Sequence, residues 1–185
     1  RSGLSVNDTV QVLYTTVVNT STTRTVWRKH PKAAAYRING KQVLDTFYID
    51  QNLNTMANTY SYSVQAVDSC GNTSAAIPPS QTVLLTATNT NENEYALLTY
   101  SPYYYWTNGV RTYEIQVQVQ NQWNTLATTG NSSTSFKDLH FADSLMQSGN
   151  SYTVTPHRAA DAYSRHAGND SAAAAGRSEE RRVGK

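Results

Sequence analysis

The 185-residue chain has one cysteine, Cys70, and charged residues make up only 15% of it, well below the usual ~25%. A single cysteine cannot form a disulfide within the chain. No stretch approaches the ~20 apolar residues that a membrane-spanning helix needs, and no glycine-rich phosphate loop is present. These absences give no support to a disulfide-rich, membrane-inserted or nucleotide-binding class of protein.

Residues with catalytic or metal-binding chemistry are few and scattered. The four histidines lack the spacing of metal ligands; they are His30, His140, His157 and His166. No acid or histidine stands in a pattern that activates a nucleophile, so Cys70 is expected to be a buried or idle thiol, with pairing to a cysteine outside this stretch as the alternative. We therefore expect no catalytic residue, no metal, no cofactor and no enzymatic activity.

The net charge of +2 comes entirely from the last nine residues, 177–185. That string matches the translation of a common sequencing-library adapter, so we expect it to be adapter read-through and exclude it from fold reasoning. A genuine basic tail is the alternative. The remaining residues are formally neutral, which gives no support to a nucleic-acid partner. Since the chain begins at Arg1 without a leader pattern, we expect it to be an internal piece of a longer protein.

Neutral polar residues and tyrosines dominate what is present: Ser, Thr and Asn supply 58 residues, and there are 13 tyrosines. Such residues suit a half-exposed sheet surface. In residues 60–67, Tyr60, Tyr62, Val64 and Ala66 alternate with polar residues, which predicts a strand with one buried face. Residues 68–74 then concentrate turn formers around Gly71.

A weaker copy of this pattern recurs downstream at an offset of 77 to 90 residues. The anchors recur in the same order: Tyr36 with Tyr113, Asp50 with Asp138, and Tyr62 with Tyr152. This spacing is close to the ~100 residues that a β-sandwich needs, so it predicts two tandem β-sandwiches. We expect a first domain over 1–88, a linker over 89–94, a second domain over 95–158 that lacks its last strand, and an irregular tail over 159–176.

The expected strands of the first domain end with one at 81–86, and Trp27 is expected in the core. The predicted interior comprises Trp27, Tyr36, Ile38, Leu53, Tyr62, Val64 and Ala66. In the second domain Tyr100 stands where a tryptophan is expected, and residues 123–128 predict one additional strand. The sixth strand of the second domain is expected to be an unpaired edge.

The run 60–74 closely resembles the sixth strand and following turn of a fibronectin type III domain. Together with Leu97–Val110 and Tyr113–Ile115, it resembles the fibronectin-type repeats of gliding motility-associated C-terminal proteins of Bacteroidota. The resemblance covers roughly residues 8–157. It implies an all-β fold of immunoglobulin-like sandwiches, the second one truncated, in large proteins exported by the type IX system with an extracellular or outer-surface location.

One segment carries a functional hypothesis: the aromatic loop of Tyr103, Tyr104, Tyr105 and Trp106. Flat aromatic faces on a loop can stack on sugar rings or on a peptide. The alternative is that Trp106 and one tyrosine fold back onto the sandwich, and this structural role is favoured.

The resulting hypothesis is a non-catalytic structural or adhesive spacer of a large secreted protein. Its expected partners are neighbouring domains of the same polypeptide and a cell-surface polysaccharide or protein, with no nucleic acid and no membrane insertion. The alternative is an accessory carbohydrate- or peptide-binding module of a secreted hydrolase.

Overall fold

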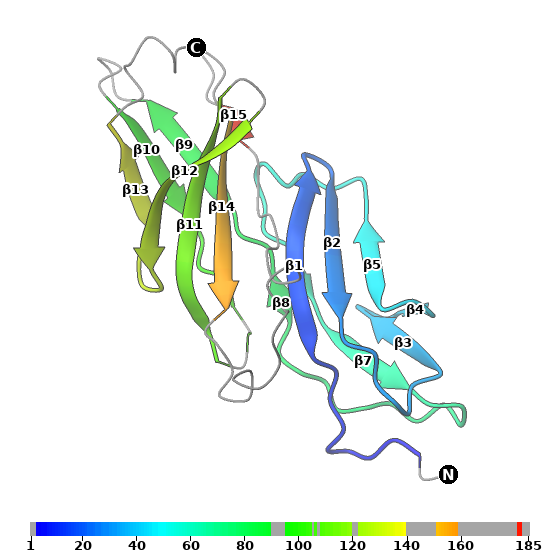
Figure 1. Cartoon of the computed structure of the whole chain (residues 1–185). Helices are drawn as coiled ribbons and strands as arrows, with labels where there is room; N and C mark the ends of the chain where they lie inside the picture. Colours follow the sequence, from blue (N-terminus) through cyan, green and yellow to red (C-terminus); the bar gives the residue numbers. More distant parts are fainter. Residues whose placement is uncertain are drawn as a thin grey trace.

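The computed structural model describes residues 3–89, 95–104, 106, 108–119, 122–139, 151–158 and 181–182. Every regular element in these residues is a strand, and the strands form two sandwiches that lie side by side (Figure 1). The predicted fold class, all-β with tandem sandwiches, is confirmed. Within the described part of the chain, no helix is long and apolar enough to span a membrane.

The first sandwich has two main sheets with the strand orders β1-β2-β5 and β4-β3-β7. Its strands are β1 (Val12–Asn19), β2 (Thr22–Trp27), β3 (Ala35–Ile38), β4 (Lys41–Val43), β5 (Phe47–Asp50), β6 (Ser61–Tyr62), β7 (Val64–Val67) and β8 (Ser80–Gln81). All pairs are antiparallel, and β6 pairs with β8. The sixth strand predicted at 60–67 is therefore present but interrupted at Ser63.

The core of the first sandwich follows the predicted alternation with one exception. The buried members are Trp27, Tyr36, Ile38, Tyr62, Val64 and Ala66, joined by Val10 and Val12. Leu53 is only partly buried, so its predicted place in the core is wrong. It follows Asn52, whose positive φ of 63° marks a turn, and the backbone N–H of Leu53 donates to the carbonyl oxygen of Ser21 in the turn between β1 and β2, at the end of the sheet.

The second sandwich repeats the same strand order, as β9-β10-β13 against β12-β11-β14-β15. Its strands are β9 (Leu85–Asn89), β10 (Ala96–Tyr100), β11 (Val110–Val119), β12 (Gln122–Gly130), β13 (Ser135–Asp138), β14 (Ser151–Arg158) and β15 (Arg181–Arg182). The strand expected at 123–128 is present as β12. The equivalent of β12 in the first sandwich is β4, and the predicted internal repeat is visible in the matching sheets.

The seventh strand predicted over 81–86 for the first sandwich is wrong, because this segment is shared between the two sandwiches. Only Ser80–Gln81 pairs within the first one, whereas Leu85–Asn89 pairs with β10 of the second. Val83 and Leu85 are buried in the second core, so apolar burial draws the segment there. Of the linker predicted at 89–94, Asn89 ends β9, and residues 90–94 lie outside the described residues.

The sixth strand of the second sandwich, β14, was expected to be unpaired, and this is wrong for its first two residues. Ser151 and Tyr152 pair with Arg182 and Arg181 of β15. Arg181 and Arg182 fall inside the segment 177–185, which was expected to be adapter read-through. A two-residue charged strand carries no alternation of apolar and polar residues, so sequence patterning cannot reveal it. The other residues of 159–185 lie outside the described residues.

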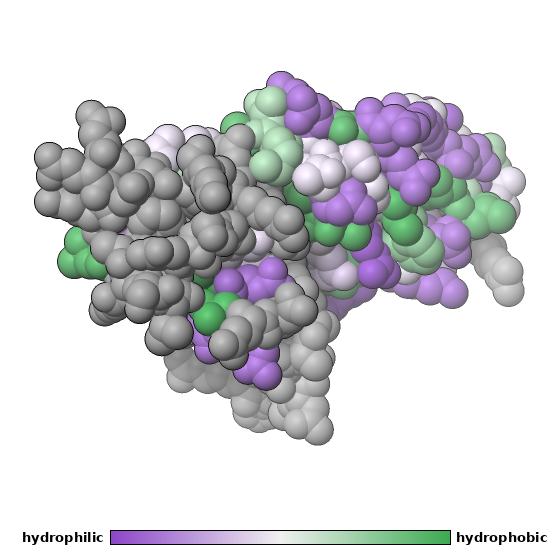
Figure 2. Space-filling view, turned by 90° about the horizontal axis from the view of Figure 1, so that it is seen from above, coloured by the Kyte–Doolittle hydropathy of each residue, from purple (hydrophilic) through white to green (hydrophobic). Residues whose placement is uncertain are grey.

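Large exposed aliphatic and phenylalanine side chains on the described surface are few, and two of them, Phe47 and Ile49, share one face of β5; the set comprises Val6, Val18, Leu44, Phe47, Ile49 and Leu139. Figure 2 shows hydrophilic residues interspersed with hydrophobic ones over the visible side of the first sandwich. Single exposed apolar residues are ordinary on protein surfaces. They do not by themselves mark a binding site.

Candidate functional site

The loop with the predicted aromatic cluster connects β10 to β11, and the buried side chain of Tyr113 holds it in place. The hydroxyl oxygen of Tyr113 accepts a hydrogen bond from the backbone N–H of Tyr103 at 2.8 Å. Tyr113 itself is 1% exposed and packs 5.1 Å from the ring of Tyr100. This buried contact fixes where the loop leaves the sheet and turns its side chains toward the first sandwich.

The side chain of Tyr103 reaches across to the first sandwich. Its hydroxyl oxygen accepts a hydrogen bond from the backbone N–H of Thr15 at 2.9 Å. It also shares a hydrogen bond of 2.9 Å with the hydroxyl of Ser80. Burial raises the pKa of the Tyr103 hydroxyl, because the charged form would be desolvated there. The Tyr103 side chain is therefore neutral, and its hydroxyl connects the two sandwiches by hydrogen bonds.

Trp106 and Arg158 extend this contact along the same strand. The indole N–H of Trp106 donates to the carbonyl oxygen of Leu13 at 2.8 Å, and the guanidinium of Arg158 donates to the carbonyl oxygen of Val12 at 3.3 Å. The guanidinium also lies 5.4 Å from the ring centre of Trp106, within range of a cation–π contact. We call this set the interdomain contact: Tyr103, Trp106 and Arg158 on Val12, Leu13 and Thr15.

The interdomain contact covers a sheet edge. β1 pairs with β2 on one side, and its other side faces the second sandwich (Figure 1). An uncovered edge offers unpaired N–H and C=O groups to other chains. Here three side chains satisfy such groups on Val12, Leu13 and Thr15, so β1 ends its sheet without needing another strand.

Beside the interdomain contact lies a pocket of about 460 Å³. Its lining combines apolar groups with one cation and comprises Thr9, Val10, Gln11, Val12, Ile77, Pro78, Trp106 and Arg158.

The members of the predicted aromatic cluster differ in their exposure to solvent. Tyr103 and Trp106 are 5% and 6% exposed, Tyr104 is 48% exposed, and Tyr105 lies outside the described residues. Ligand contact by these residues stays a prediction.

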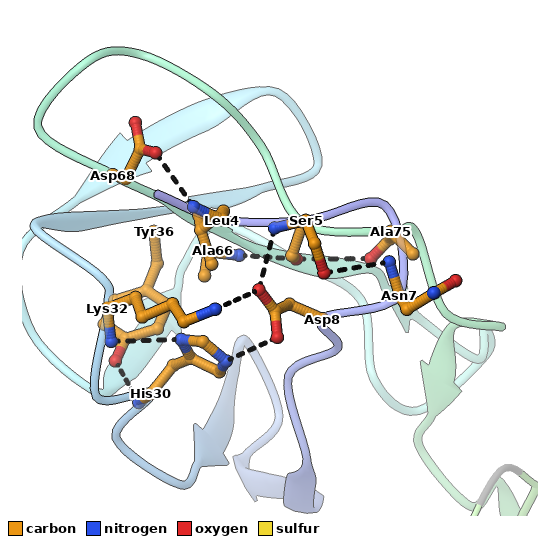
Figure 3. A network of polar contacts seen from close by, with 11 residues as sticks. Leu4, Ser5, Asn7, Asp8, His30, Lys32, Tyr36, Ala66, Asp68 and Ala75 are labelled. Carbon is orange, nitrogen blue, oxygen red and sulfur yellow. Dashed lines mark hydrogen bonds and ion pairs between the residues drawn. The ribbon is translucent and has the colours of Figure 1, made fainter. Parts of the chain in front are cut away.

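The first sandwich uses the equivalent loop differently, to hold a local polar network (Figure 3). The hydroxyl of Tyr36 accepts the backbone N–H of His30 at 2.8 Å, as Tyr113 does for Tyr103. Next to it, Lys32 Nζ lies 3.1 Å from an Asp8 carboxylate oxygen, and His30 Nε2 lies 3.9 Å from the other. Hydrogen bonding from the N–H of Ser5 and then from Lys32 lowers the pKa of Asp8.

Asp68 organises the turn that follows β7. Its carboxylate accepts the backbone N–H groups of Leu4, Cys70 and Asn72 and the side-chain amide of Asn72. These bonds, the Asn72 side-chain amide first, lower the pKa of Asp68 to about 2. The carboxylate ties the N-terminal segment to the turn, which is a structural task.

The described residues contain no group of three or more metal-binding side chains. His30 contacts Asp8, and His157 lies 3.0 Å from a carboxylate oxygen of Glu114; His140 and His166 lie outside the described residues. Cys70 is exposed, so its expected burial is wrong, whereas an idle thiol or pairing outside this stretch stays a prediction. The exposure follows from its place in the turn ordered by Asp68.

Sequence reasoning missed the β1 side of the interdomain contact and Arg158. The backbone groups of Val12, Leu13 and Thr15 carry no sequence signal, because any residue supplies them. Arg158 had a signal: Tyr62 and Tyr152 are anchors of the repeat, and the strand registers agree by placing Tyr36 opposite Ala66 and Tyr113 opposite Pro156. Two residues farther along, Arg158 occupies the position of Asp68, so a cation replaces the turn-forming acid.

Comparison with known proteins gives structural neighbours only. No protein-family model matches the sequence, and no curated protein matches it. Among solved structures, a two-domain fibronectin type III segment of chicken tenascin is 16% identical, with a TM-score of 0.32, over 95% of this chain and 98% of that one. The FN1–FN3 domains of chicken CNTN1 are 11% identical, with a TM-score of 0.36, over 98% and 68%.

A third neighbour is the central fibronectin-III array of RIM-binding protein, which is 12% identical with a TM-score of 0.32 over 84% of this chain and 67% of that one. The sequence identities are too low to carry over a ligand or a partner. The description of each sandwich therefore rests on its own strand order and core.

Proposed function

We propose that the two sandwiches are non-catalytic structural modules that act as a spacer in a large secreted or cell-surface protein. The observation that carries this proposal is the interdomain contact. Domains joined only by a linker normally move relative to one another. Three hydrogen-bonding side chains at Tyr103, Trp106 and Arg158 oppose that motion.

The composition fits the same role. Neutral polar residues dominate the sequence, and the loop richest in aromatic residues is used for domain packing. The gliding motility-associated repeats of Bacteroidota are the family proposed, on the sequence resemblance over 60–74 and 97–115. Export by the type IX system, an extracellular or outer-surface location, and partnership with neighbouring domains of the same polypeptide belong to this proposal.

A second candidate function is an accessory carbohydrate- or peptide-binding module. It is favoured by one observation: Trp106 and Arg158 line a partly apolar pocket, and Tyr104, two residues before Trp106, is 48% exposed. Exposed aromatic side chains and partly apolar pockets are common features of sugar and peptide sites.

Glycan and peptide arrays probed with the full chain and with Tyr104→Ala separate the two functions. Tyr104 is the substitution of choice because Trp106→Ala would also break the interdomain contact. The spacer proposal predicts no reproducible binding above background for either protein. Saturable binding that Tyr104→Ala abolishes, with an unchanged melting temperature, would replace the spacer by the binding module.

A further inference from the structure

The strand β12 (Gln122–Gly130) forms one edge of the four-stranded sheet of the second sandwich. Among the described strands it pairs with β11 only. It is nine residues long, and the sequence has no charged residue between Glu114 and Lys137 and no proline between Pro102 and Pro156. Long, uncharged edges of this kind are open to pairing with another strand.

The other edges described in this protein are short, charged or covered. β4, the equivalent of β12, has three residues and begins with Lys41. β5 has four residues and ends with Asp50, and β13 has four and contains Lys137. β1 is covered by the interdomain contact, and β9 lies against β14 and β15. The fold thus protects its edges in the usual ways, with β12 as the exception in length and charge.

One protective feature does occur in β12. Ile115 pairs with Ala127 and Gln116 with Thr125, so Leu126 is an extra residue in the ladder. Such a bulge increases the local twist. It bends the edge without adding charge, and the exposed residues at either side of it, Asn124 and Thr128, remain neutral.

We propose that β12 is a self-association edge, where two copies of this chain pair antiparallel, β12 against β12, into one continuous sheet. The carboxylate of Glu114 on β11 reaches β12, where it accepts a hydrogen bond from Thr125, and it lies 3.0 Å from His157. A second copy fits because β12 itself carries no charge, so it offers no opposite charge to a charged strand and meets its own copy without repulsion between its own side chains. Uncharged threonine, asparagine and glutamine side chains also form favourable cross-strand pairs. Pairing about a two-fold axis uses up both edges, so assembly stops at a dimer.

One strand seam buries less surface than a standard protein–protein interface, so the dimer is expected to be weak and reversible. Sedimentation velocity of the full chain over a series up to millimolar concentration is the first measurement. We expect the weight-average sedimentation coefficient to rise from the monomer value toward that of a dimer, and no further. A monomer at every concentration would overturn the proposal.

Substitutions then locate the interface. Asn124→Lys/Thr128→Lys places two cations on the β12 edge and is expected to abolish dimerisation. Asn131→Lys/Ser132→Lys adds the same charge in the adjoining turn, at exposed positions, and is expected to dimerise like the parent chain. Dimerisation that survives the β12 substitutions to the same degree would overturn the proposal.

A variant with the opposite charge at the same positions tests whether the lysine variant is monomeric only because it is misfolded. Asn124→Glu/Thr128→Glu alone is expected to be monomeric, whereas an equimolar mixture with the lysine variant is expected to dimerise, because opposite charges then face each other. Hydrogen exchange of the unsubstituted chain gives an independent measurement: β12 amides should exchange more slowly at high than at low protein concentration. Exchange rates for β12 that do not change with concentration would contradict the proposal.

Discussion

The two sandwiches place an aromatic residue at the same position, at the end of β2 and of β10, but they treat its polar atom differently. Trp27 packs edge-on against Tyr36 at 5.4 Å, and its indole N–H has no hydrogen-bond partner among the described residues. Tyr100 packs against Tyr113 at 5.1 Å, and its hydroxyl shares a 2.9 Å hydrogen bond with Thr129. The departure from the tryptophan pattern thus keeps the packing and satisfies the buried polar atom.

The loops next to these residues differ more than the cores do. In the first sandwich His30 and Asp68 serve a local network with the N-terminal segment. At the equivalent places in the second sandwich, Tyr103 and Arg158 contact the neighbouring sandwich. The sheets thus have the same arrangement in both repeats, whereas the loops at one end determine what each repeat contacts.

The largest expected effect comes from removing the core aromatic residue. Trp27→Ala should lower the free energy of unfolding of the first sandwich by about 3–5 kcal/mol, because a large buried side chain leaves a cavity. Trp27→Phe should cost less, since it keeps a ring and removes the unpaired N–H. Urea unfolding followed by NMR signals of each sandwich measures both; a loss below about 1 kcal/mol for Trp27→Ala would contradict the packing described.

A second comparison uses the hydrogen bond between a tyrosine and an aspartate that recurs in both repeats. Tyr62 donates to Asp50 at 3.0 Å, and Tyr152 donates to Asp138 at 2.9 Å. Tyr152→Phe should cost about 1–3 kcal/mol, because Asp138 is 1% exposed and cannot turn to water. The Tyr62 hydroxyl also hydrogen-bonds the buried Thr23, so Tyr62→Phe is compared in a Thr23→Val background. There it should cost less, since Asp50 is more exposed than Asp138.

The same urea experiment measures both tyrosine variants, each against the unchanged sandwich of the same molecule as its control. Equal costs for the two would show that the exposure of the aspartate does not matter. A larger cost for Tyr62→Phe would contradict the comparison.

The smallest effect concerns pH and the turn at Asp68. Its folded pKa of about 2 is below the usual value near 3.9. The carboxylate therefore stabilises the first sandwich fully above about pH 4, and this contribution is lost as the pH falls toward about 2. Melting temperatures between neutral pH and pH 2 should fall less steeply for Asp68→Asn than for the parent chain. Parallel curves for the two proteins would contradict the role assigned to Asp68.

The alternating strands could be predicted because each places apolar residues on one face, as Tyr113, Ile115 and Val117 do in β11. The repeat could be predicted because the tyrosine and aspartate anchors have the same task in both copies. β9 was assigned to the wrong sandwich, since an apolar run shows burial but not in which core. The interdomain contact could not be predicted from the sequence, because backbone groups supply half of it.

The central claim is that the interdomain contact holds the two sandwiches in one orientation. Cys70 is exposed in the first sandwich and is the only cysteine, so Ser132→Cys in the second supplies a pair for spin labels. Pulsed electron spin resonance then gives the distribution of distances between the labels. A Tyr103→Phe/Trp106→Phe form of the labelled chain keeps an aromatic ring at both positions and removes the Tyr103 hydroxyl and the Trp106 indole N–H.

We predict one narrow distance peak for the labelled chain and a clearly broader distribution for the phenylalanine variant, with each sandwich still folded by NMR. Equally broad distributions in both would mean that the sandwiches move freely and that the contact does not set their orientation. That result would contradict the account.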